Sequence, residues 1–598
     1  MKERELTYID GNQLFFSFLS GASKIFDNQN YINKINVFPV ADADTGTNLA
    51  STMRAIVETA TPSQSIKLTA ESISDAALTG ARGNSGIIFA QFLFGFSNEL
   101  NGEEKLSPKG FAAASSQAVR YAYEAIADPK EGTMISVIRE WAEHLLELID
   151  RENHASFYHF LSDGLKKAHI SLKETTKKMD KLARAKVVDA GAQGFVNFLE
   201  GMVEYFRTGK TPDMDSLKAV VIETDEHIDH DEITYRYCTE ALIKGEDLSK
   251  EKVKSILTGF GDSMVIAGAS TKMRIHIHTD TPWLLFEKLS KISTIIAQKV
   301  DDMVQQNDIA AHAKAKIALV TDSSVDLPQE LIEKHQIQVI PLNIHFGETY
   351  YLDGITMQAE QFYTMLDKSP VYPTTSQPSY KDFYNRYNYL STHFDSIIGI
   401  NLSAKLSGTW QNSLNAANKV SEQTGKNIEV LNSKKVSCGM GLIALRTARA
   451  IEEGMSHDEL VAQIPMWSLK TKQFASLKTL KYLVKSGRIT RGRGLVGNLL
   501  NLKPVIEVTS SGVVSNIGKK MSNSKSRELM LAQARQYLKG KKLWGYAITH
   551  ASNPETADWL AVKMEALTGK KPEFTYTVTP VLIAHVGIGS VSLSLMLE

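Results

Sequence analysis

The sequence predicts a multidomain protein with an all-α N-terminal part, a small α/β middle domain and an α/β C-terminal part. The chain has 598 residues, which is too long for one hydrophobic core, so three or four domains are expected. Apolar residues recur at helical spacing from residue 1 to about 208, whereas strand-like and helix-like segments alternate from residue 233 onwards. Near Lys316 the pattern changes again, and a longer α/β sequence runs from there to residue 598. The expected domains are therefore 1–208, 233–310 and 316–598, with a linker at 209–232.

Composition indicates an ordinary globular protein with no global pull toward nucleic acid. Hydrophobic residues make up 43% and charged residues 22% of the chain, and basic and acidic residues are equal at 67 each. The two cysteines exclude a disulfide framework and suit a reducing compartment. We see no apolar run of about 20 residues, which a membrane span needs, and no signal-peptide core near Met1. We therefore expect a cytoplasmic protein without an integral membrane segment.

A loop with two aspartates, VFPVADADTGTN at 37–48, precedes a helix-patterned run. Asp42 and Asp44 can converge on one Mg²⁺, which prefers oxygen ligands and commonly shares them with phosphates. Thr45 or Thr47 then begins a helix, whose free N–H groups favour a phosphate. The alternative is an acidic turn that only caps a helix, and this motif alone does not decide between the two.

Three further loops in the helical part are rich in glycine and precede helices. Their sequences are GARGNSG at 80–86, EGT at 131–133 and VVDAGAQG at 187–194. Glycines there allow backbone N–H groups to approach phosphates closely. Any one of these loops alone is better explained as a helix cap or a turn. Four in one helical domain favour a nucleotide site.

The middle domain carries a cysteine and two histidines in strand-like segments. His276 and His278 lie on one face of a strand because side chains repeat every two residues, and Cys238 meets them if its strand is a neighbour. Such a set suits Zn²⁺ with one position left for water or another group. A polar strand face beside a buried cysteine explains the spacing equally well.

In the C-terminal part, hydroxyl-rich loops follow predicted strands at 374–379, 401–409 and 432–435. Ligands of open α/β sheets bind outside the carboxyl ends of the strands, and hydroxyl groups there suit a carboxylate or a phosphate. Two other segments stand out, KSGRITRGRG at 485–494 and IAHVGIGS at 583–590. Each also fits ordinary β-turns and helix caps.

These motifs together resemble a known pair of bacterial proteins joined in one chain. NVFPVADADTGTN, GARGNSG, EGT and VVDAGAQG resemble the loops of the DhaL (DAK2) domain in the ATP-binding component of bacterial fatty acid kinase. Residues 233–305, with GDS and HIHTD, resemble the middle domain of the same component. TDSSVDLP, PTTSQPS, LSGTWQ, LKYLVKSGRI, KPVI and AHVGIGS resemble the DegV family of fatty-acid-binding proteins. The implied fold is a DhaL-like helical barrel, a small α/β domain and a DegV-like two-lobed α/β fold.

The resemblance also implies roles for individual residues. It makes Asp42 and Asp44 ligands of Mg²⁺, and Cys238, His276 and His278 ligands of Zn²⁺. The third Mg²⁺ ligand is not identified, because Asn36 or Val37 falls near where related sugar kinases have a third aspartate. Residues expected to line ATP are Thr45, Thr47, Asn48, Gly83, Asn84, Ser85, Gly86, Thr133, Asp189, Gly191 and Gly194. Residues expected to bind the fatty acid are Thr375, Ser376, Ser407, Gly408, Arg488 and His585, of which Arg488 and His585 lie near its carboxylate and serve catalysis.

The function predicted in this way is transfer of the ATP γ-phosphoryl group to a long-chain fatty acid. A downstream acyltransferase, transient contact with a membrane surface and a homodimer that reacts in trans are compatible with this prediction. One departure from the family pattern is Ala43, where the family has glycine; if that residue has φ > 0, the loop is strained by about 1 kcal/mol. The leading alternative is a non-catalytic fatty-acid-binding protein with a nucleotide-responsive or scaffolding helical domain. A small-polyol kinase is a weaker alternative, because a three-carbon substrate needs no cavity for a tail.

Overall fold

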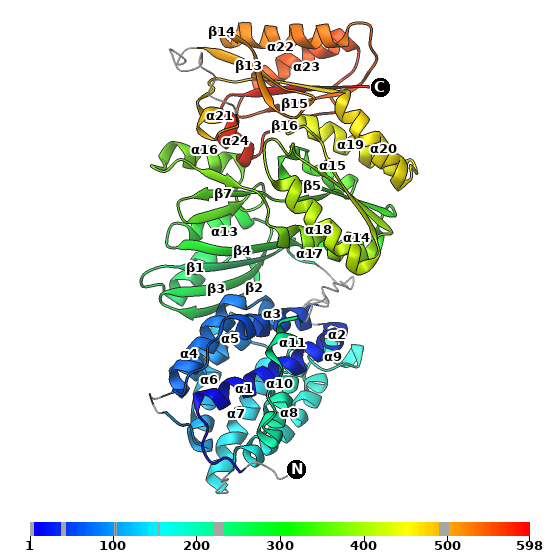
Figure 1. Cartoon of the computed structure of the whole chain (residues 1–598). Coiled ribbons are helices and arrows are strands. Elements are labelled where there is room, and N and C mark those ends of the chain that lie inside the picture. Colours follow the sequence, from blue (N-terminus) through cyan, green and yellow to red (C-terminus); the bar gives the residue numbers. More distant parts are fainter. Residues whose placement is uncertain are drawn as a thin grey trace. The chain divides into compact units, whose positions relative to one another are not determined.

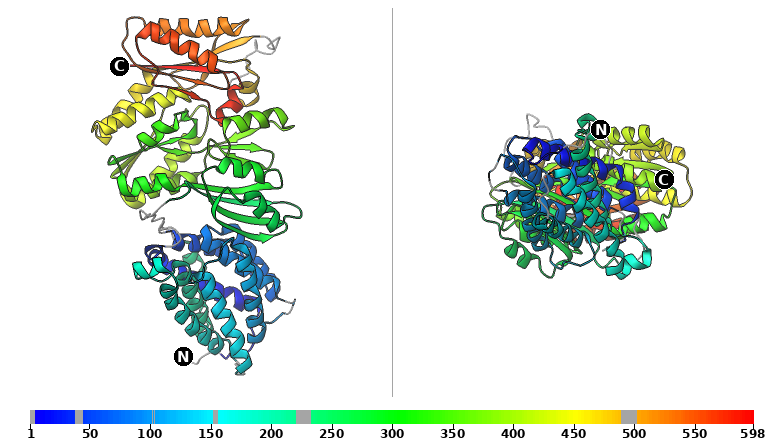
Figure 2. Two further views of the ribbon diagram at one scale, coloured as in Figure 1. Left: turned by 180° about the vertical axis from the view of Figure 1, so that it is seen from behind. Right: turned by 90° about the horizontal axis from the view of Figure 1, so that it is seen from below.

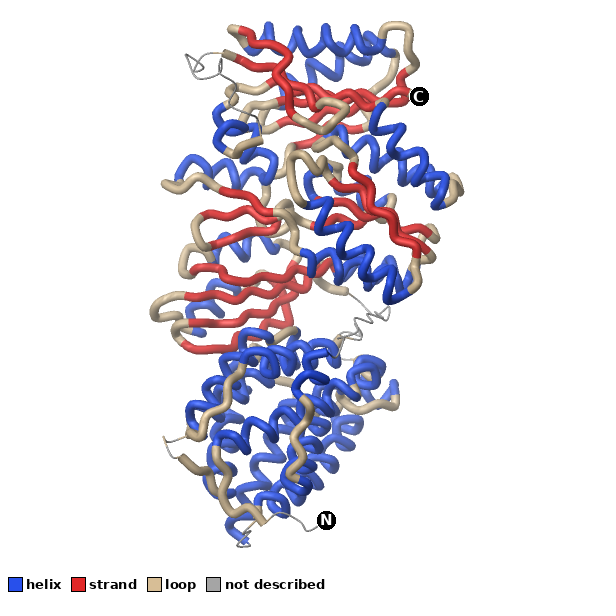
Figure 3. The backbone as a smooth tube through the Cα atoms, in the orientation of Figure 1, coloured by secondary structure: helices blue, strands red, loops and turns tan. Residues whose placement is uncertain are grey.

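The computed structural model describes residues 5–37, 44–100, 102, 104–151, 156–219, 233–488 and 502–598, except for the side chains of 150, 151 and 219. The chain divides into two compact units, Met1–Ala310 and Ala311–Glu598. Helix dominates the part up to residue 208, and the strands lie in the segments that follow (Figure 3). The multidomain α and α/β architecture predicted from the sequence is confirmed.

The first part of the first unit is a ring of antiparallel helices (Figure 1). Its helices are α1 Gly11–Asp27, α2 Gln29–Lys34, α3 Thr45–Thr59, α4 Ile66–Gly80, α5 Gly83–Asn98, α6 Pro108–Ala125, α7 Met134–Arg151, α8 Phe157–Lys178, α9 Asp180–Ala185 and α10 Ala190–Thr208. Neighbours follow the order α1, α10, α8, α7, α6, α5, α4 and back to α1. Apolar residues at helical spacing face the inside, where Trp141, Phe89 and Phe195 pack edge to face.

A short helix, α11 Met214–Ala219, lies within the segment predicted as a linker. The Arg54 guanidinium donates hydrogen bonds of 2.8 Å to the backbone carbonyls of Leu217 and Lys218. The Leu217 side chain is buried with the helical core. This part of 209–232 therefore packs on the helical domain, while residues 220–232 lie outside the described residues.

The middle domain is a four-stranded antiparallel sheet in the order β2-β3-β1-β4. Its elements are β1 Tyr237–Lys244, α12 Lys250–Leu257, β2 Gly261–Ala269, β3 Lys272–Thr279, α13 Pro282–Leu289, β4 Thr294–Asp302 and α14 Met303–His312. The sheet packs on α5, where the Gly268 amide donates a 2.7 Å hydrogen bond to the Gln91 side chain. Val265 and Ala267 join the helical core, so both parts form one unit.

The second unit has two lobes, which share three sheets between them (Figure 2). The first lobe holds a parallel sheet, β11-β10-β5-β6, and a small sheet, β8-β7-β9; the second holds the six-stranded sheet β14-β13-β12-β17-β15-β16. The strands are β5 Ile317–Asp322, β6 Gln338–Ile340, β7 Asn343–Phe346, β8 Thr349–Leu352, β9 Thr374–Ser376, β10 Ser396–Asn401, β11 Asn427–Asn432, β12 Thr471–Ser476, β13 Lys503–Val508, β14 Val514–Lys520, β15 Leu543–His550, β16 Phe574–Thr577 and β17 Val591–Leu597.

Helices cover the sheets of this unit and supply its polar loops. They are the 3₁₀ turn η1 Ser323–Val325, α15 Gln329–Lys334, α16 Ala359–Lys368, α17 Tyr380–His393, α18 Thr409–Thr424, α19 Cys438–Glu452, α20 His457–Leu469, α21 Lys481–Lys485, α22 Asn523–Leu538, α23 Pro554–Thr568 and α24 Pro580–Val586. Helices α17, α18 and α20 pack on the parallel sheet, and α22 and α23 pack on the six-stranded sheet. Among the described residues, every helix is too short or too polar to cross a membrane.

Candidate nucleotide, metal and acyl-chain sites

The helix starts that follow the four loops singled out in the helical part, those of α3, α5, α7 and α10, lie close together. A Cβ atom on Gly83 would lie 2.2 Å from Asn48 Nδ2, so the starts of α3 and α5 touch. A Cβ atom on Gly191 would lie 2.8 Å from Ser85 Oγ and 3.2 Å from Met134 Cβ, which joins the starts of α10, α5 and α7. Helix N-termini carry unpaired N–H groups and the positive end of the helix dipole. Their convergence makes a cradle for an anion such as a polyphosphate.

Asp189 fixes two of these helix starts relative to each other. Its carboxylate accepts a 2.8 Å hydrogen bond from the Ala192 amide and caps α10. Burial raises the pKa of Asp189 to about 6, although backbone N–H groups of Ala192, Met134 and Gly191 act in the opposite direction. Because Met134 is the first residue of α7, this carboxylate connects α7 to α10. Asp189 therefore holds the starts of α7 and α10 together.

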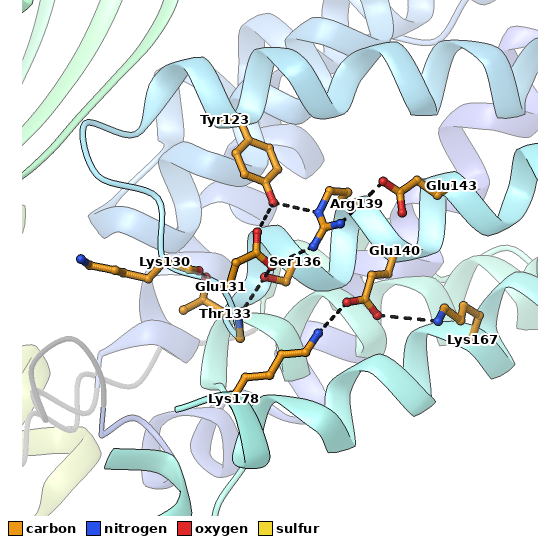
Figure 4. Close-up of polar contacts among 11 residues, drawn as sticks. Tyr123, Lys130, Glu131, Thr133, Ser136, Arg139, Glu140, Glu143, Lys167 and Lys178 are labelled. Carbon is orange, nitrogen blue, oxygen red and sulfur yellow. Dashed lines mark hydrogen bonds and ion pairs between the residues drawn. The ribbon is translucent and has the colours of Figure 1, made fainter. Parts of the chain in front are cut away.

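The EGT loop is held by a compact polar cluster (Figure 4). The Ser136 hydroxyl donates to Glu131 Oε2 at 2.8 Å and accepts from the Gly132 amide at 2.9 Å. Arg139 donates to Glu131 at 2.7 Å and to the Tyr123 hydroxyl at 3.0 Å, and Tyr123 donates to the other Glu131 oxygen at 3.0 Å. Partial burial opposes ionisation, but the bonds from Ser136 and Tyr123 and the charge of Arg139 lower the pKa of Glu131 below its ordinary value. The loop is therefore rigidly positioned.

Thr133 follows this cluster at the start of α7. Its hydroxyl donates a 2.8 Å hydrogen bond to the Lys130 carbonyl, and the residue is only partly exposed. Gly132 has φ +86°, and a Cβ atom there would lie 2.7 Å from Lys178 Cβ. The end of α8 is tied to α7 by the 2.7 Å ion pair of Lys178 with Glu140 (Figure 4). The glycine is needed because the two helices approach so closely.

The aspartate loop is described only from Asp44 onwards. Asp42, Ala43 and the rest of 38–43 lie outside the described residues, so the magnesium site stays a prediction. Asp44 stands directly before α3 and is partly exposed. The hydroxyl of Thr47 accepts hydrogen bonds from Asn33 at 3.0 Å and Gln29 at 3.2 Å, which anchors the start of α3 to α2.

Other expected nucleotide residues follow the same helix starts. Thr45 and Asn48 are buried in the first turn of α3, Asn84 and Gly86 lie in the first turn of α5, and Gly194 packs against Leu49. Asn36 and Val37, the positions near which related sugar kinases have a third aspartate, are buried and partly exposed, respectively. The structure thus brings the described members of the predicted nucleotide set to one region.

The middle-domain sheet brings the three predicted metal ligands together. In the antiparallel register Cys238 faces His278, and candidate ligand atoms of Cys238, His276 and His278 all lie within 4.8 Å of one another. Tetrahedral zinc with Zn–S of about 2.3 Å and Zn–N of about 2.0 Å needs ligand separations of about 3.3–3.6 Å. The Cys238 Sγ to His276 Nδ1 distance is 3.9 Å, and the buried Nε2 atom of His276 has no partner among the described residues. The residues present therefore fit a zinc ion after small side-chain movements.

Glu240, which the sequence did not single out, lies two residues after Cys238 on the same strand. It is 2% exposed and pairs with Arg274 at 2.6 Å. Burial favours the neutral acid, but the charge of Arg274 and a hydrogen bond with His276 hold the pKa of Glu240 well below its usual range. The other carboxylate oxygen accepts a 2.6 Å hydrogen bond from the Gly83 amide. The middle domain thus touches the start of α5 directly.

Between the two lobes of the second unit lies a cavity of about 380 Å³. This volume falls in the range of about 300–1,000 Å³ that is usual for small-molecule sites. Its walls are mostly aliphatic and come from both lobes: Leu342, Leu402, Leu406, Val436, Phe474, Ala475, Leu477, Leu483, Ile506, Val508, Val514, Val578, Val581, Leu582, Val586 and Val591. Such a cavity suits an apolar chain.

Polar side chains line part of this cavity, and all six predicted substrate residues are among its lining residues. These are Thr375, Ser376, Ser407, Gly408, Arg488 and His585. The Thr375 hydroxyl and His585 Nε2 lie 2.9 Å apart. Burial, and then the charge of Arg488, lower the pKa of His585 to about 4. The imidazole is therefore neutral near pH 7, and Arg488 is the cation on this wall.

The remaining polar wall residues have local partners. The Ser407 hydroxyl is 2.8 Å from the hydroxyl of Thr409 in the first turn of α18. Ser376 is hydrogen-bonded to His345 at 2.9 Å, so its hydroxyl is already engaged. A Cβ atom on Gly408 would lie 2.4 Å from the Gln377 side chain. Glycine at 408 thus lets Gln377 approach the loop closely.

Two buried aspartates hold α24, the helix that carries His585. Asp326 accepts from the Thr579 amide at 2.8 Å, and Asp353 accepts from the Val581 amide at 2.9 Å. Burial raises the pKa of each carboxyl to about 7. Asp326 belongs to the TDSSVDLP segment that stood out in the sequence, whereas Asp353 had no distinguishing signal. Both aspartates position α24, which carries His585 on the polar wall of the cavity, but neither aspartate lines the cavity.

The protein combines helix N-termini that suit an anion with an apolar cavity that has one polar wall. These two features suit the binding of a phosphorylated nucleotide and of an amphipathic chain. Comparison with known families agrees with these features. Residues 39–204 match the DAK2 domain, residues 234–309 match the FakA-like middle domain of fatty acid kinase, and residues 316–598 match the DegV family of uncharacterised proteins. The chain joins a DAK2 domain, a FakA-like middle domain and a DegV domain in one polypeptide.

Individual relatives cover only part of the chain. An uncharacterized protein of Staphylococcus saprophyticus is 30% identical over 312 residues, which is 50% of this chain and 56% of the relative. An uncharacterized protein of Staphylococcus aureus is 29% identical over 319 residues, or 50% of this chain and 57% of the relative. The chain thus spans little more than half the length of these curated relatives.

Among solved structures, a fatty-acid-binding DegV family protein from Thermus thermophilus is 29% identical, with a TM-score of 0.44, over 47% of this chain and all of its own. DegV from Bacillus subtilis, a fatty-acid-binding protein, is 27% identical, with a TM-score of 0.43, over 48% of this chain and all of its own.

Proposed function

We propose that the protein is a fatty acid kinase, which transfers the ATP γ-phosphoryl group to the carboxylate of a long-chain fatty acid. The observation that carries the proposal is the cavity of the second unit, in which Thr375, Ser407, Arg488 and His585 line one apolar chamber. The chain also contains a cradle of four helix starts that suits ATP. A middle domain of the fatty acid kinase type in the same chain supports this pairing of nucleotide and fatty acid.

Recognition of the carboxylate follows from the neutral state of His585. A neutral ring can carry its proton on Nε2 and donate it to Thr375 Oγ1, which lies 2.9 Å away. The Thr375 hydroxyl proton is then available to donate to a carboxylate oxygen. Ser407 offers a second hydroxyl, and Arg488 supplies the positive charge. Hydrogen bonds to a charged group contribute about 1.5–3 kcal/mol each.

The reaction needs no general base, because a carboxylic acid with a reference pKa near ~4 is ionised at neutral pH. A carboxylate oxygen attacks the γ-phosphorus and forms a new P–O bond. The bond from the γ-phosphorus to the β–γ bridging oxygen breaks, and ADP leaves with that electron pair. The products are acyl phosphate and ADP. The task of the protein is therefore positioning of the two reactants and neutralisation of charge.

The two implied metals belong to the first unit. Asp42 and Asp44 are the residues that would hold Mg²⁺, which neutralises phosphate charge when bound. Cys238, His276 and His278 would hold Zn²⁺, and a bound ion would link β1 to β3 of the middle domain. The first turns of α3, α5, α7 and α10 would orient phosphates through the backbone N–H groups that have no acceptor among the described residues, such as those of Asn84 and Ser85.

A coupled assay tests the proposal on the full chain. Purified protein with Mg-ATP should release ADP only when a long-chain fatty acid is added, and acyl phosphate should be trapped by hydroxylamine. The variant Asp42→Ala/Asp44→Ala should lose turnover but bind fatty acid as the wild type does. Fatty acid binding without acid-dependent ADP release would instead assign the chain to non-catalytic fatty-acid-binding proteins. Turnover retained in the double variant would move the metal site elsewhere.

A further inference from the structure

Glu240 makes a contact that spans the helical and middle domains at the nucleotide cradle. One carboxylate oxygen accepts the Gly83 N–H at 2.6 Å, and the other accepts from Arg274 at 2.6 Å. The side chain is 2% exposed, so both bonds are shielded from water. Glu240 comes from β1 and Gly83 begins α5, and 157 residues separate them. The contact is therefore long-range and direct.

Gly83 lies in the GARGNSG loop at 80–86, called here the phosphate loop, and is the first residue of α5. Its φ is +56°, a conformation that favours glycine, and its Cα faces the Asn48 side chain. An N–H group at a helix start normally bonds to a side chain, water or a ligand. Here the first N–H of α5 is taken by Glu240, which leaves the following residues, Asn84 and Ser85, for a ligand. Glu240, which accepts the hydrogen bond from the Gly83 N–H, thus sets the orientation of the N–H groups of Asn84 and Ser85.

A carboxylate beside a phosphate site would repel the phosphate if its charge were not balanced. Arg274 balances it, since its guanidinium pairs with Glu240 in the same buried space. His276 Nδ1 lies 3.7 Å from the same oxygen that accepts from Gly83. The carboxylate therefore connects the metal-ligand face of the sheet to the phosphate loop.

We propose that Glu240 is a positioning residue of the nucleotide site, which holds the Gly83–Gly86 turn from the middle domain in the conformation that binds phosphates. The inference rests on the proposed function of this loop as a phosphate site. Nucleotide affinity then depends on a residue outside the helical domain. The part that matters is a neutral or charged oxygen acceptor facing Gly83, and the ion pair with Arg274 serves only to balance charge.

Two double variants separate the acceptor from the ion pair. Glu240→Gln/Arg274→Gln removes both charges but keeps an oxygen for the Gly83 N–H and a mutual amide hydrogen bond. Glu240→Leu/Arg274→Leu removes both charges and the acceptor. Replacement of a buried ion pair by apolar residues of similar volume is often neutral for stability, so the second variant is expected to fold. Lys272→Ala, which breaks the 3.2 Å contact with Asp75 between the same two domains, is the matched control.

The measurement is the Kd of Mg-ADP by calorimetry on the full chain. We expect the leucine pair to weaken binding at least tenfold, and the glutamine pair and Lys272→Ala to stay within threefold of the wild type. Fatty acid binding should be unchanged in all three. Equal affinities for the leucine and glutamine pairs would overturn the inference.

Bound zinc is measured in each variant, because a loss of affinity that follows a loss of zinc would assign Glu240 to the metal site and also overturn it. A wild-type chain that binds no nucleotide would refute the proposed function itself. If instead the wild type binds nucleotide and the leucine pair binds it equally well, only the role of Glu240 is refuted.

Discussion

Thr375 Oγ1 and His585 Nε2 lie 2.9 Å apart although 210 residues separate them in the sequence. One residue is on β9 of the first lobe and the other is on α24, which precedes the last strand of the second lobe. The polar wall of the cavity is therefore assembled across both lobes. A ligand bound there engages residues of both.

Replacement of Thr375 tests this wall. Thr375→Val keeps the shape of the side chain but removes the hydroxyl, so the carboxylate loses one donor and His585 loses its partner. We expect fatty acid affinity to fall about 10- to 100-fold, as for loss of a hydrogen bond to a charged group. Thr374→Val, at the exposed neighbouring position on β9, is the control and should bind normally. Fluorescent fatty acid displacement measures both, and equal affinities would remove Thr375 from the site.

Strain at the phosphate loop gives a second prediction. Gly83→Ala places a methyl group 2.2 Å from Asn48 Nδ2 at a residue with φ +56°. The loop must shift to relieve a clash and about 1–2 kcal/mol of backbone strain. We expect Mg-ADP affinity to fall at least tenfold while fatty acid affinity is kept. Gly102→Ala, in the same domain with no atom within 4 Å, should leave both affinities unchanged, and calorimetry compares them.

The buried aspartates make stability depend on pH. The folded pKa of Asp326 and of Asp353 is about 7, above the ordinary value of 3.8. A carboxyl with a raised pKa binds more protons in the folded state, so its stabilising contribution is present below pH 3.8 and is lost as pH rises through 7. Each carboxyl accounts for at most about 4 kcal/mol. The thermal transition temperature of the second unit should therefore fall as pH rises from about 4 to 7 and level off above pH 7.

Asp326→Asn/Asp353→Asn should flatten this decline, measured by differential scanning calorimetry of the full chain. Between pH 4 and 6.5 His585 acts in the opposite sense and offsets part of this decline. Its folded pKa of about 4 lies below the ordinary 6.5, so its contribution is lost as pH falls from 6.5 toward 4. A wild-type decline that persists in the double variant would show that other groups cause it.

Zinc content tests the middle domain. Wild-type protein should bind about one zinc per chain, because three donors within 4.8 Å fit a site with one position open. Cys238→Ala/His276→Ala should bind none, as measured by inductively coupled plasma mass spectrometry. Cys438→Ala is the matched control, since that thiol is buried in the other unit beside Ser594 at 3.2 Å. Zinc retained by the double variant would place the ion elsewhere.

The sequence predicted features whose signal is local and missed those that depend on long-range contact. Period-two and helical spacing located β1, β3 and the long helices, and glycine-rich turns marked the loops that precede α5, α7 and α10. The roles of Glu240 and Asp353 were not predictable, because each is a lone acid without a motif and its partners lie far away in the chain. Sequence motifs indicate which residues are candidates for a functional site. Strand register and the packing of the lobes determine which of these residues are in contact.

The connection between the two units leads to the last prediction. Helix α14 ends at His312 and β5 begins at Ile317, so few residues join the units. A short tether gives a high effective concentration only if its geometry lets the two sites meet, and almost none otherwise. If that geometry keeps the two sites of one chain apart, we expect phosphoryl transfer to occur between two chains. Asp44→Ala and Thr375→Val/Ser407→Ala proteins, each inactive alone, should then recover activity when mixed, to about a quarter of the wild-type rate for statistically mixed dimers.

Rates are compared over a range of protein concentrations, with each variant mixed with wild-type protein as the control. A mixture that stays inactive at every concentration would instead require that the kinase and acyl-chain sites of one chain reach each other.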